Sequence, residues 1–372
     1  MKNYIEKILF EICDKLQLTP TLYQQADRRY RVIAETIRNN SVFNDIELNI
    51  YPQGSFRLKT TVKPIGEEEY DLDFVAELPE DSTMTPNALY NHIASILSND
   101  GIHNDMVQLK KRCVRVNYAN DFHIDIMPGK LINKSTGEII VPDRELKSWY
   151  HRSNPIGFAE WFENQARTQL LYEMNSFRDI KCSVEEVSEQ ELTARLEPLR
   201  RAVQLVKRFR DVYCLRKGIE PVRSIVICTL MGKITSFTGD TLDIIERFCQ
   251  YVNNLISQSS PYPFVVMNPV VDEKLTEKWD EGSNYKDFVS MMKALSLYVK
   301  KLRVCSYNGD ANKLIKEMFG ETVTNSAITA YAKRVNADRV AGNLRINNKG
   351  ALCTDKSGAP IKSNTFYGES QV

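Results

Sequence analysis

The chain has 372 residues, of which 42% are hydrophobic and 26% are charged, and its formal net charge is +1. This length is typical of a globular protein with two lobes, and the near-zero net charge excludes a general field that recruits nucleic acid. The eight cysteines include no CxxC pair and the four histidines form no cluster, so neither a disulfide framework nor a zinc module is expected.

Two helices are predicted at the N-terminus. Apolar residues recur at helical spacing over residues 4–16. The second helix begins at Thr19-Pro20-Thr21, where a hydroxyl cap precedes an early proline, and runs to about Asn39. Charges alternate with apolar side chains at the start of the chain, and the longest apolar run, residues 224–232, is too short to cross a bilayer. We therefore expect no signal peptide, no membrane span and a cytoplasmic protein.

Short alternating segments with turn residues between them predict β-strands after the second helix. We expect the hairpin tip between the last two strands at residues 119–121. The strands themselves are predicted at residues 46–55, 71–78, 113–118 and 122–127.

The chain turns helical again from about residue 185. The strongest helix is predicted at residues 196–218, where apolar residues fall on one side and Gly218 ends the helix. Further helices are predicted at residues 241–257, 284–302 and 322–335, and the remaining C-terminal residues predict turns and short surface strands. The sequence thus predicts an α/β lobe followed by a helical lobe, joined near residues 180–195.

Two carboxylates stand one residue apart in the second predicted strand. Asp71 and Asp73 share one face of that strand, while Leu72 and Phe74 face the core. Two carboxylates about 4–5 Å apart repel by several kcal/mol at a surface dielectric, and no lysine or arginine lies within residues 69–77. A divalent cation is the expected partner, because hard cations prefer carboxylate oxygens.

A third carboxylate, Asp125, lies between Ile124 and Ile126 in a later predicted strand. If the two strands are neighbours, all three acids converge on one point. Three acids around two cations are the arrangement used for in-line phosphoryl or nucleotidyl displacement.

A glycine-serine pair precedes the carboxylates. Gly54 follows an extended segment, so the backbone there has room to approach a phosphate closely. Backbone N–H groups and the Ser55 hydroxyl are then available to hold a triphosphate. A lone D-x-D pattern usually lies on a solvated edge or in a turn, but the pattern as a whole predicts a metal-dependent nucleotide site.

These residues resemble the polymerase-β-like nucleotidyltransferase superfamily. They are most similar to its CD-NTase family, the bacterial cyclic-oligonucleotide synthases related to cyclic GMP-AMP synthase. The resemblance covers residues from about 20 to 280. It rests on PQGSFRLKTTVKP (52–64), EYDLDFVAEL (69–78), HIDIMPG (123–129), PD (142–143) with Trp149, GFAEWF (157–162), LRRAVQLVKRFRD (199–211), PVRSIVICTL (221–230) and NPVVDEKLTEKW (268–279).

The resemblance implies an α+β fold with a bilobal polymerase-β-like core, a mixed sheet and a helical second lobe. It divides the chain into a nucleotidyltransferase core with the N-terminal helices (1–190), a helical nucleotide-binding lobe (191–335) and a C-terminal surface segment (336–372).

The resemblance also implies site residues. Asp71, Asp73 and Asp125 are the catalytic acids and would hold two Mg²⁺ ions, with Mn²⁺ as a substitute. The remaining positions are nucleotide-binding: Gly54 and Ser55 at the donor triphosphate, Lys207 and Ser224 reaching it from the second lobe, and Gln53 and Arg57 beside the glycine turn.

Three of these positions, and the neighbouring His123, have alternative interpretations. Without the resemblance, a solvated helix face beside Arg208 and Arg210 explains Lys207 as well as a phosphate-binding role does. Gln53 and Arg57 fit surface positions. His123, on the same strand face as Asp125, fits either a neighbour of the metal or a packing histidine.

The implied activity is a Mg²⁺-dependent condensation of nucleoside triphosphates, ATP among them, into a cyclic di- or trinucleotide second messenger. The family context is anti-phage defence of the CBASS type, in which a separate effector protein reads the product and other proteins regulate the enzyme or conjugate its C-terminus. Activation by double-stranded DNA is not expected, because zinc ligands and a strongly basic surface are both missing from the sequence.

Two other functions stay open. One is template-independent nucleotidyl transfer to RNA, to a protein or to a small acceptor, against which the near-neutral charge argues, since RNA binding needs a basic track. The other is a non-catalytic nucleotide-binding scaffold, against which the three acids argue, because clustered carboxylates without a cation cost stability.

Overall fold

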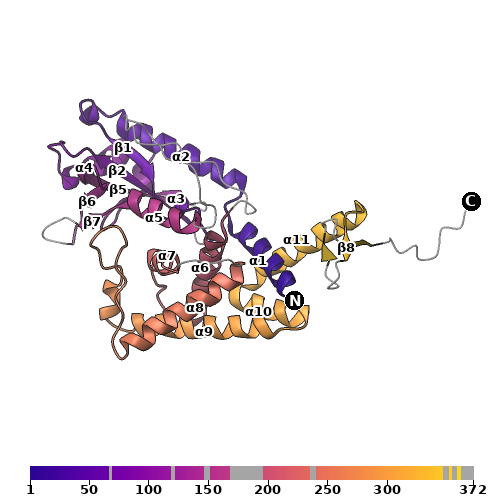
Figure 1. Cartoon of the computed structure of the whole chain (residues 1–372). Helices are drawn as coiled ribbons and strands as arrows, with labels where there is room; N and C mark the ends of the chain where they lie inside the picture. Colours follow the sequence, from indigo (N-terminus) through magenta and orange to yellow (C-terminus); the bar gives the residue numbers. More distant parts are fainter. Residues whose placement is uncertain are drawn as a thin grey trace, which may run out of the picture.

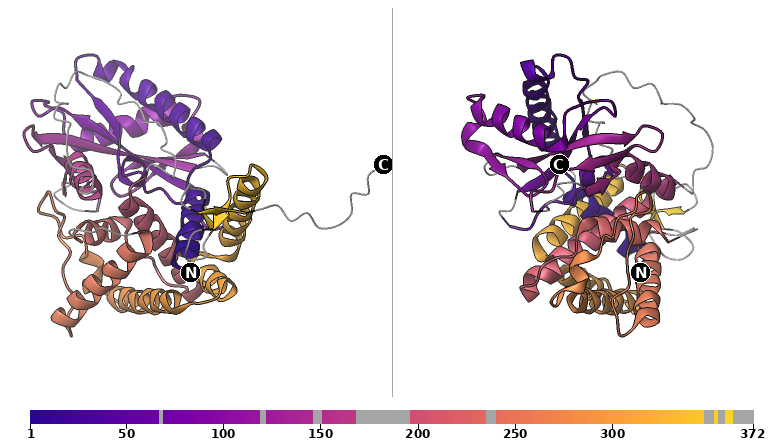
Figure 2. Two further views of the ribbon diagram at one scale, coloured as in Figure 1. Left: turned by 45° about the vertical axis from the view of Figure 1, so that its right-hand side comes forward. Right: turned by 90° about the vertical axis from the view of Figure 1, so that its left-hand side faces the viewer.

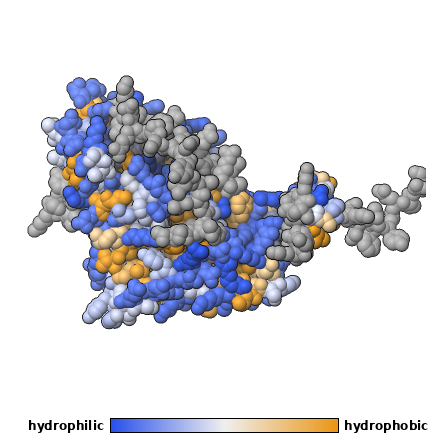
Figure 3. All heavy atoms as spheres, viewed as in Figure 1, coloured by the Kyte–Doolittle hydropathy of each residue, from blue (hydrophilic) through white to orange (hydrophobic). Residues whose placement is uncertain are grey.

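The structure is a computed structural model that describes residues 1–66, 69–118, 122–145, 151–167, 196–234, 240–346, 352–353 and 358–361. It has two lobes, a mixed β-sheet with helices and a lobe built of helices (Figure 1, Figure 2). The predicted α+β, bilobal fold is therefore confirmed. Apolar residues form small patches among hydrophilic ones on the face that Figure 3 shows. None of the helices in the described ranges is long and apolar enough to cross a membrane.

The sheet of the first lobe brings together two strands that are far apart in the sequence. Strand β2 pairs with β5 in parallel, so that Asp73 lies opposite Asp125. The sheet order is β1-β2-β5-β4-β3, and β6 pairs with both β5 and β7. The strands are β1 (Asn49–Pro52), β2 (Tyr70–Leu78), β3 (Val107–Leu109), β4 (Val114–Tyr118), β5 (Phe122–Asn133), β6 (Glu138–Val141) and β7 (His151–Ser153).

Helices α2 (Pro20–Arg38) and α4 (Pro86–Asn99) share a hydrophobic cluster with the inner face of the sheet. Leu72 and Phe74 of β2 belong to this cluster and are almost fully buried, as the strand alternation predicts. The Tyr30 ring of α2 stacks on Phe74 with 4.2 Å between the ring centroids. This packing commits one face of β2 to the core and leaves the other face for Asp71 and Asp73.

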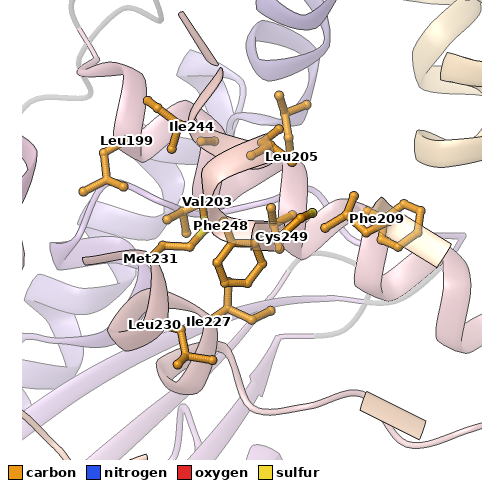
Figure 4. Close-up of a cluster of buried hydrophobic side chains, with 14 of the residues drawn as sticks. Leu199, Val203, Leu205, Phe209, Ile227, Leu230, Met231, Ile244, Phe248 and Cys249 are labelled. Atoms are coloured by element: carbon orange, nitrogen blue, oxygen red, sulfur yellow. The ribbon is translucent and has the colours of Figure 1, made fainter. Parts of the chain in front are cut away.

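The second lobe has its own hydrophobic core, part of which Figure 4 shows around Phe209, Ile227 and Phe248. The first helix, α1, contributes its buried residues to this core, and so do Phe158 and Phe162 of α5. The two lobes are therefore interlocked. The helices are α1 (Lys2–Leu16), α5 (Pro155–Arg167), α6 (Pro198–Lys217), α7 (Ser224–Gly232), α8 (Thr241–Ser259), α9 (Asn284–Val304), α10 (Asn308–Phe319) and α11 (Glu321–Val340). The division of the chain at residues 190 and 335 stays a prediction.

The predicted long helices are present as α1, α2, α6, α8, α9 and α11. Their end signals act as expected: the Thr19 side chain caps α2 by accepting from the Leu22 N–H, and Gly218 ends α6 with φ 63°. Helices α4, α5, α7 and α10 were not predicted. The predicted hairpin tip at residues 119–121 lies outside the described residues.

The predicted first strand is shorter than expected. The chain leaves β1 at Pro52 and forms a four-residue helix, α3 (Gly54–Arg57), instead of continuing to Ser55. Short strands near the C-terminus agree with the sequence pattern. The remaining elements are the 3₁₀ turns η1 (Ser41–Phe43), η2 (Asn104–Met106) and η4 (Glu277–Asp280) and the strands β8 (Arg345–Ile346), β9 (Leu352–Cys353) and β10 (Ala359–Pro360).

Candidate active site

Three carboxylates converge where β2 and β5 run side by side. One oxygen from each of Asp71, Asp73 and Asp125 lies within 4.8 Å of the other two. The parallel register places Asp125 opposite Asp73, and period-2 alternation turns Asp71 to the same face. The predicted convergence of the three acids is confirmed, and an all-carboxylate set of this size suits a hard divalent cation.

The acids have a basic neighbour that the sequence analysis missed. Arg115 on β4 lies directly opposite Asp125 in the sheet. Its Nε and Nη2 donate to the two carboxylate oxygens of Asp125 at 2.6 and 2.7 Å, and Nη2 also donates to Asp71 Oδ1 at 3.2 Å. The sequence analysis considered basic residues only within residues 69–77, whereas Arg115 is 44 residues from Asp71 along the chain.

The three acids differ in their electrostatic surroundings. Burial raises the pKa of Asp73 well above its ordinary value, and the nearby charges of Asp71 and Asp125 raise it further. Burial acts in the same direction on Asp71, but hydrogen bonding to His123 and the charge of Arg115 outweigh it, so the pKa of Asp71 is lowered. Asp73 is therefore harder to ionise than Asp71.

His123 lies beside the acids and not in the apolar core. Its Nε2 is 3.1 Å from Asp71 Oδ1, and its Nδ1 is 3.4 Å from Glu69 Oε2. The hydrogen bond with Asp71 is the main reason that the pKa of His123 is raised. Of the two interpretations of this residue, the structure favours a neighbour of the acid cluster.

Gly54 is fitted closely against the acids. Its φ is +60°, and a Cβ built on it would lie 2.3 Å from Asp73 Oδ2. Glycine is therefore required both by the backbone conformation and by the contact. The next residue, Ser55, turns its hydroxyl toward Thr61 with 3.5 Å between the two oxygens. The predicted phosphate-binding turn at Gly54 and Ser55 therefore packs directly against Asp73, one of the predicted metal ligands.

The side chains that flank Gly54 are held by the first lobe. Gln53 Nε2 lies 3.9 Å from the Met127 sulfur, and the Arg57 Nη1 donates to the Pro52 carbonyl at 3.3 Å. Both residues line the same cavity as the acids.

Helix α6 holds the segment after α3 by its polar side chains. Lys207 Nζ donates to the Thr60 carbonyl at 2.8 Å, Gln204 to Thr61 at 3.1 Å and Arg208 to Lys63 at 3.2 Å. Lys207, Arg208 and Arg210 are all buried, so the solvated helix face does not exist. Backbone carbonyls of both lobes cover these side chains, since Arg208 also donates to Phe319 and Arg210 to Val222. Burial lowers the pKa of Lys207.

Ser224 is the first residue of α7, a helix that the sequence analysis did not predict. Its Oγ accepts from Arg210 Nη1 at 2.9 Å, and Arg210 also donates to the Val222 carbonyl at 2.8 Å. Arg210 therefore fixes the turn that carries Ser224.

A single cavity joins these positions. Its volume is about 720 Å³, which lies within the range of nucleotide and ligand sites. Asp125 is the one predicted site residue outside its lining. The lining includes the other eight: Gln53, Gly54, Ser55, Arg57, Asp71, Asp73, Lys207 and Ser224.

Another part of the cavity lining, His151, Asn268 and Glu273, comes from residues without an assigned role in the sequence analysis. His151 on β7 lies 3.1 Å from Glu273 in the connection between α8 and α9, measured from Nε2 to Oε1. This connection rises from the second lobe toward β7 (Figure 1). Asn268 holds the other carboxylate oxygen of Glu273 at 2.9 Å. Glu273 belongs to the NPVVDEKLTEKW segment that carries part of the family resemblance, but its partner His151 is 122 residues away in the sequence.

Comparisons with known proteins agree with this geometry. A family described as "Second Messenger Oligonucleotide or Dinucleotide Synthetase domain" matches residues 4–166. A c-di-GMP synthase of Roseivirga ehrenbergii is 31% identical, over 99% of this chain and 98% of that protein. A cyclic dinucleotide synthase, CdnG, of Bradyrhizobium diazoefficiens is 25% identical, over 89% and 84%. The solved structure of a CD-NTase CdnG from that organism, in complex with GTP, has a TM-score of 0.71 at 21% identity, covering 88% of this chain and 99% of that one.

Proposed function

The chain belongs to the CD-NTase family, and from this we propose its function. It condenses nucleoside triphosphates into a cyclic dinucleotide. The observation that carries the proposal is the intact acid cluster, two of whose carboxylates, Asp71 and Asp73, line a cavity shared by both lobes. The near full-length similarity to a c-di-GMP synthase supports guanine as one of the bases.

Asp71, Asp73 and Asp125 would hold divalent ions, Mg²⁺ first and Mn²⁺ as a substitute. Three carboxylates with one arginine between them leave an excess of negative charge, so the residues present fit such an ion. Two ions bound there would lower the pKa of the attacking hydroxyl and stabilise the pyrophosphate leaving group.

The donor triphosphate would lie along the α3 turn. Gly54 permits close approach of the backbone, and the Ser55 hydroxyl is a hydrogen-bond donor for the phosphates. Lys207 and Ser224 supply an ammonium and a hydroxyl from the second lobe, which suit the outer phosphates. Gln53 and Arg57 are the flanking contacts. To reach the phosphates, Lys207 has to exchange the Thr60 carbonyl for a phosphate oxygen.

In the proposed reaction, the hydroxyl of one nucleotide attacks the α-phosphorus of the other, and pyrophosphate leaves. A second attack, by the free hydroxyl of the linear intermediate on the α-phosphorus of its own triphosphate, closes the ring and releases a second pyrophosphate. The chain contributes mainly by positioning the two nucleotides in the cavity beside the acids. We expect a separate effector protein to read the product, in the cytoplasm and in an anti-phage context. A C-terminal conjugation role stays a prediction, because residues 362–372 lie outside the described part of the chain.

The test is an incubation with all four nucleoside triphosphates and Mg²⁺, followed by phosphatase treatment and mass spectrometry. The double variant Asp71→Asn/Asp73→Asn is the matched control. We expect a phosphatase-resistant guanine-containing product from the unmodified protein alone. Linear products alone would favour transfer to RNA, protein or a small acceptor. Nucleotide binding without pyrophosphate release, in a preparation with a verified fold, would favour the non-catalytic scaffold.

A further inference from the structure

Arg115 offsets part of the charge that the acid cluster concentrates. Its guanidinium engages both oxygens of Asp125 and one oxygen of Asp71. Its side chain is 19% exposed and that of Asp125 is 12% exposed, so bulk water screens this contact poorly. Among the hydrogen bonds that the structure describes for Arg115, none reaches Asp73.

We propose that Arg115 is a built-in cation that holds the metal-free acid cluster together and competes with divalent ions for Asp125 and Asp71. It thereby sets the metal affinity of the site. The inference rests on the proposed metal-binding role of the three acids, and it adds that Arg115 weakens the binding of the metal to them.

The competition follows from the geometry. Arg115 donates to both oxygens of Asp125, so a divalent ion bound there has to share these oxygens with the guanidinium or displace it. A guanidinium does not give up its proton in a protein, so its positive charge opposes the entry of an ion for as long as it stays on Asp125. A positive charge near the site also repels the incoming ion directly. Both effects make the observed affinity weaker than the three carboxylates alone would give.

The neighbouring Arg112 offers a matched comparison. It lies just before β4, and its Nε donates to Asp143 Oδ2 at 2.9 Å. Asp143 is fully buried and is not one of the three converging acids. Arg112 lines the same cavity as Asp71 and Asp73. Removing it therefore deletes one positive charge and one arginine–aspartate pair near the site, without freeing an oxygen of the acid cluster.

The test measures Mn²⁺ binding to the nucleotide-free, full-length chain by the electron paramagnetic resonance signal of the free ion. We expect Arg115→Met to bind Mn²⁺ about tenfold more tightly than the unmodified protein. Arg112→Met should bind with little change. Arg115→Lys, which keeps the charge but loses the two-pronged contact, should fall between the unmodified protein and Arg115→Met.

A second measurement uses the unmodified protein and does not depend on the folding of a variant. Crystals prepared with and without Mn²⁺ are compared, with the anomalous signal used to locate the ion. We expect the ion between Asp71, Asp73 and Asp125, and the Arg115 guanidinium away from Asp125 in that crystal. An ion at the cluster with Arg115 still on both Asp125 oxygens would overturn the proposal.

The outcomes separate the two levels of inference. If Arg115→Met binds Mn²⁺ as weakly as the unmodified protein, or more weakly, then Arg115 does not compete and the inference fails. If Mn²⁺ binding to every variant is unaffected by Asp73→Asn, then the ion does not bind at the acids and the proposed site itself fails.

Discussion

Gly54 and Asp73 are in contact so close that no other residue type fits at the glycine. A Cβ at position 54 would lie 2.3 Å from Asp73 Oδ2, on a backbone with φ +60°. The turn that is expected to hold the triphosphate is thus packed against a carboxylate that is expected to hold the metal.

Substitution of this glycine should therefore damage both functions. We expect Gly54→Ala to lose most synthase activity, at least about 100-fold, because Asp73 or the turn has to move from its position. Product formation at saturating nucleotide measures this. Gly101→Ala is the control, since Gly101 also has a positive φ (+71°) but nothing within 4 Å of its Cβ position. Equal loss of activity in both variants would show that backbone strain alone is responsible.

The raised pKa of Asp73 predicts a pH-dependent stability. Because burial and neighbouring charges raise its pKa above the unfolded value, the group favours folding at low pH and this contribution is lost as the pH rises through the folded pKa. Asp73→Asn should therefore raise the melting temperature in EDTA, by an amount that grows toward alkaline pH, while it abolishes activity. Differential scanning calorimetry at several pH values measures the difference. The exposed Asp45→Asn should show no such trend, and a melting temperature of Asp73→Asn below that of the unmodified protein would contradict the prediction.

Lys207 and Arg208 are neighbours on α6 that should separate binding from stability. Lys207 lines the cavity and holds the Thr60 carbonyl. We expect Lys207→Met to weaken nucleotide binding by about tenfold or more, because it removes a cation from the predicted phosphate site. Isothermal titration calorimetry with a non-hydrolysable nucleotide measures the affinity.

Arg208 holds the carbonyls of Lys63 and Phe319 and does not line the cavity. Arg208→Met should lower the free energy of unfolding by about 1–3 kcal/mol, since it leaves buried carbonyls unpaired, with little effect on nucleotide affinity. A stronger loss of affinity in Arg208→Met than in Lys207→Met would contradict the assignment of the two roles.

The His151–Glu273 contact predicts a link between the lobes that weakens in acid. The hydrogen bond from His151 is the main favourable interaction that outweighs burial and lowers the pKa of Glu273. A lowered carboxyl pKa contributes stability above the unfolded value, and this contribution is lost as the pH falls through the folded value. Glu273→Gln should therefore lower the melting temperature at neutral pH, and the difference should shrink below about pH 4. The exposed Glu277→Gln serves as control, and a difference that persists at low pH would show that charge is not the cause.

The local sequence determined which face of a strand each side chain occupies and where a helix begins or ends. Alternation along β2 turns Leu72 and Phe74 into the core and Asp71 and Asp73 to the other face, whatever strand lies beside it. The Thr19 cap of α2 and the Gly218 end of α6 were likewise predictable, because a hydroxyl cap and a glycine with positive φ act within a few residues.

Tertiary structure alone decided which side chains meet. The parallel register of β2 with β5 brings Asp125 to Asp73, and the next strand brings Arg115, which is 44 residues from Asp71. The polar side chains of α6 are buried where they donate to the carbonyls of Leu58, Thr60 and Thr61, which lie 142 to 147 residues earlier in the chain. The periodicity of the helix gives no indication of these partners. Spacing along the chain predicts faces of single elements, but charge compensation and burial depend on the neighbours that the fold supplies.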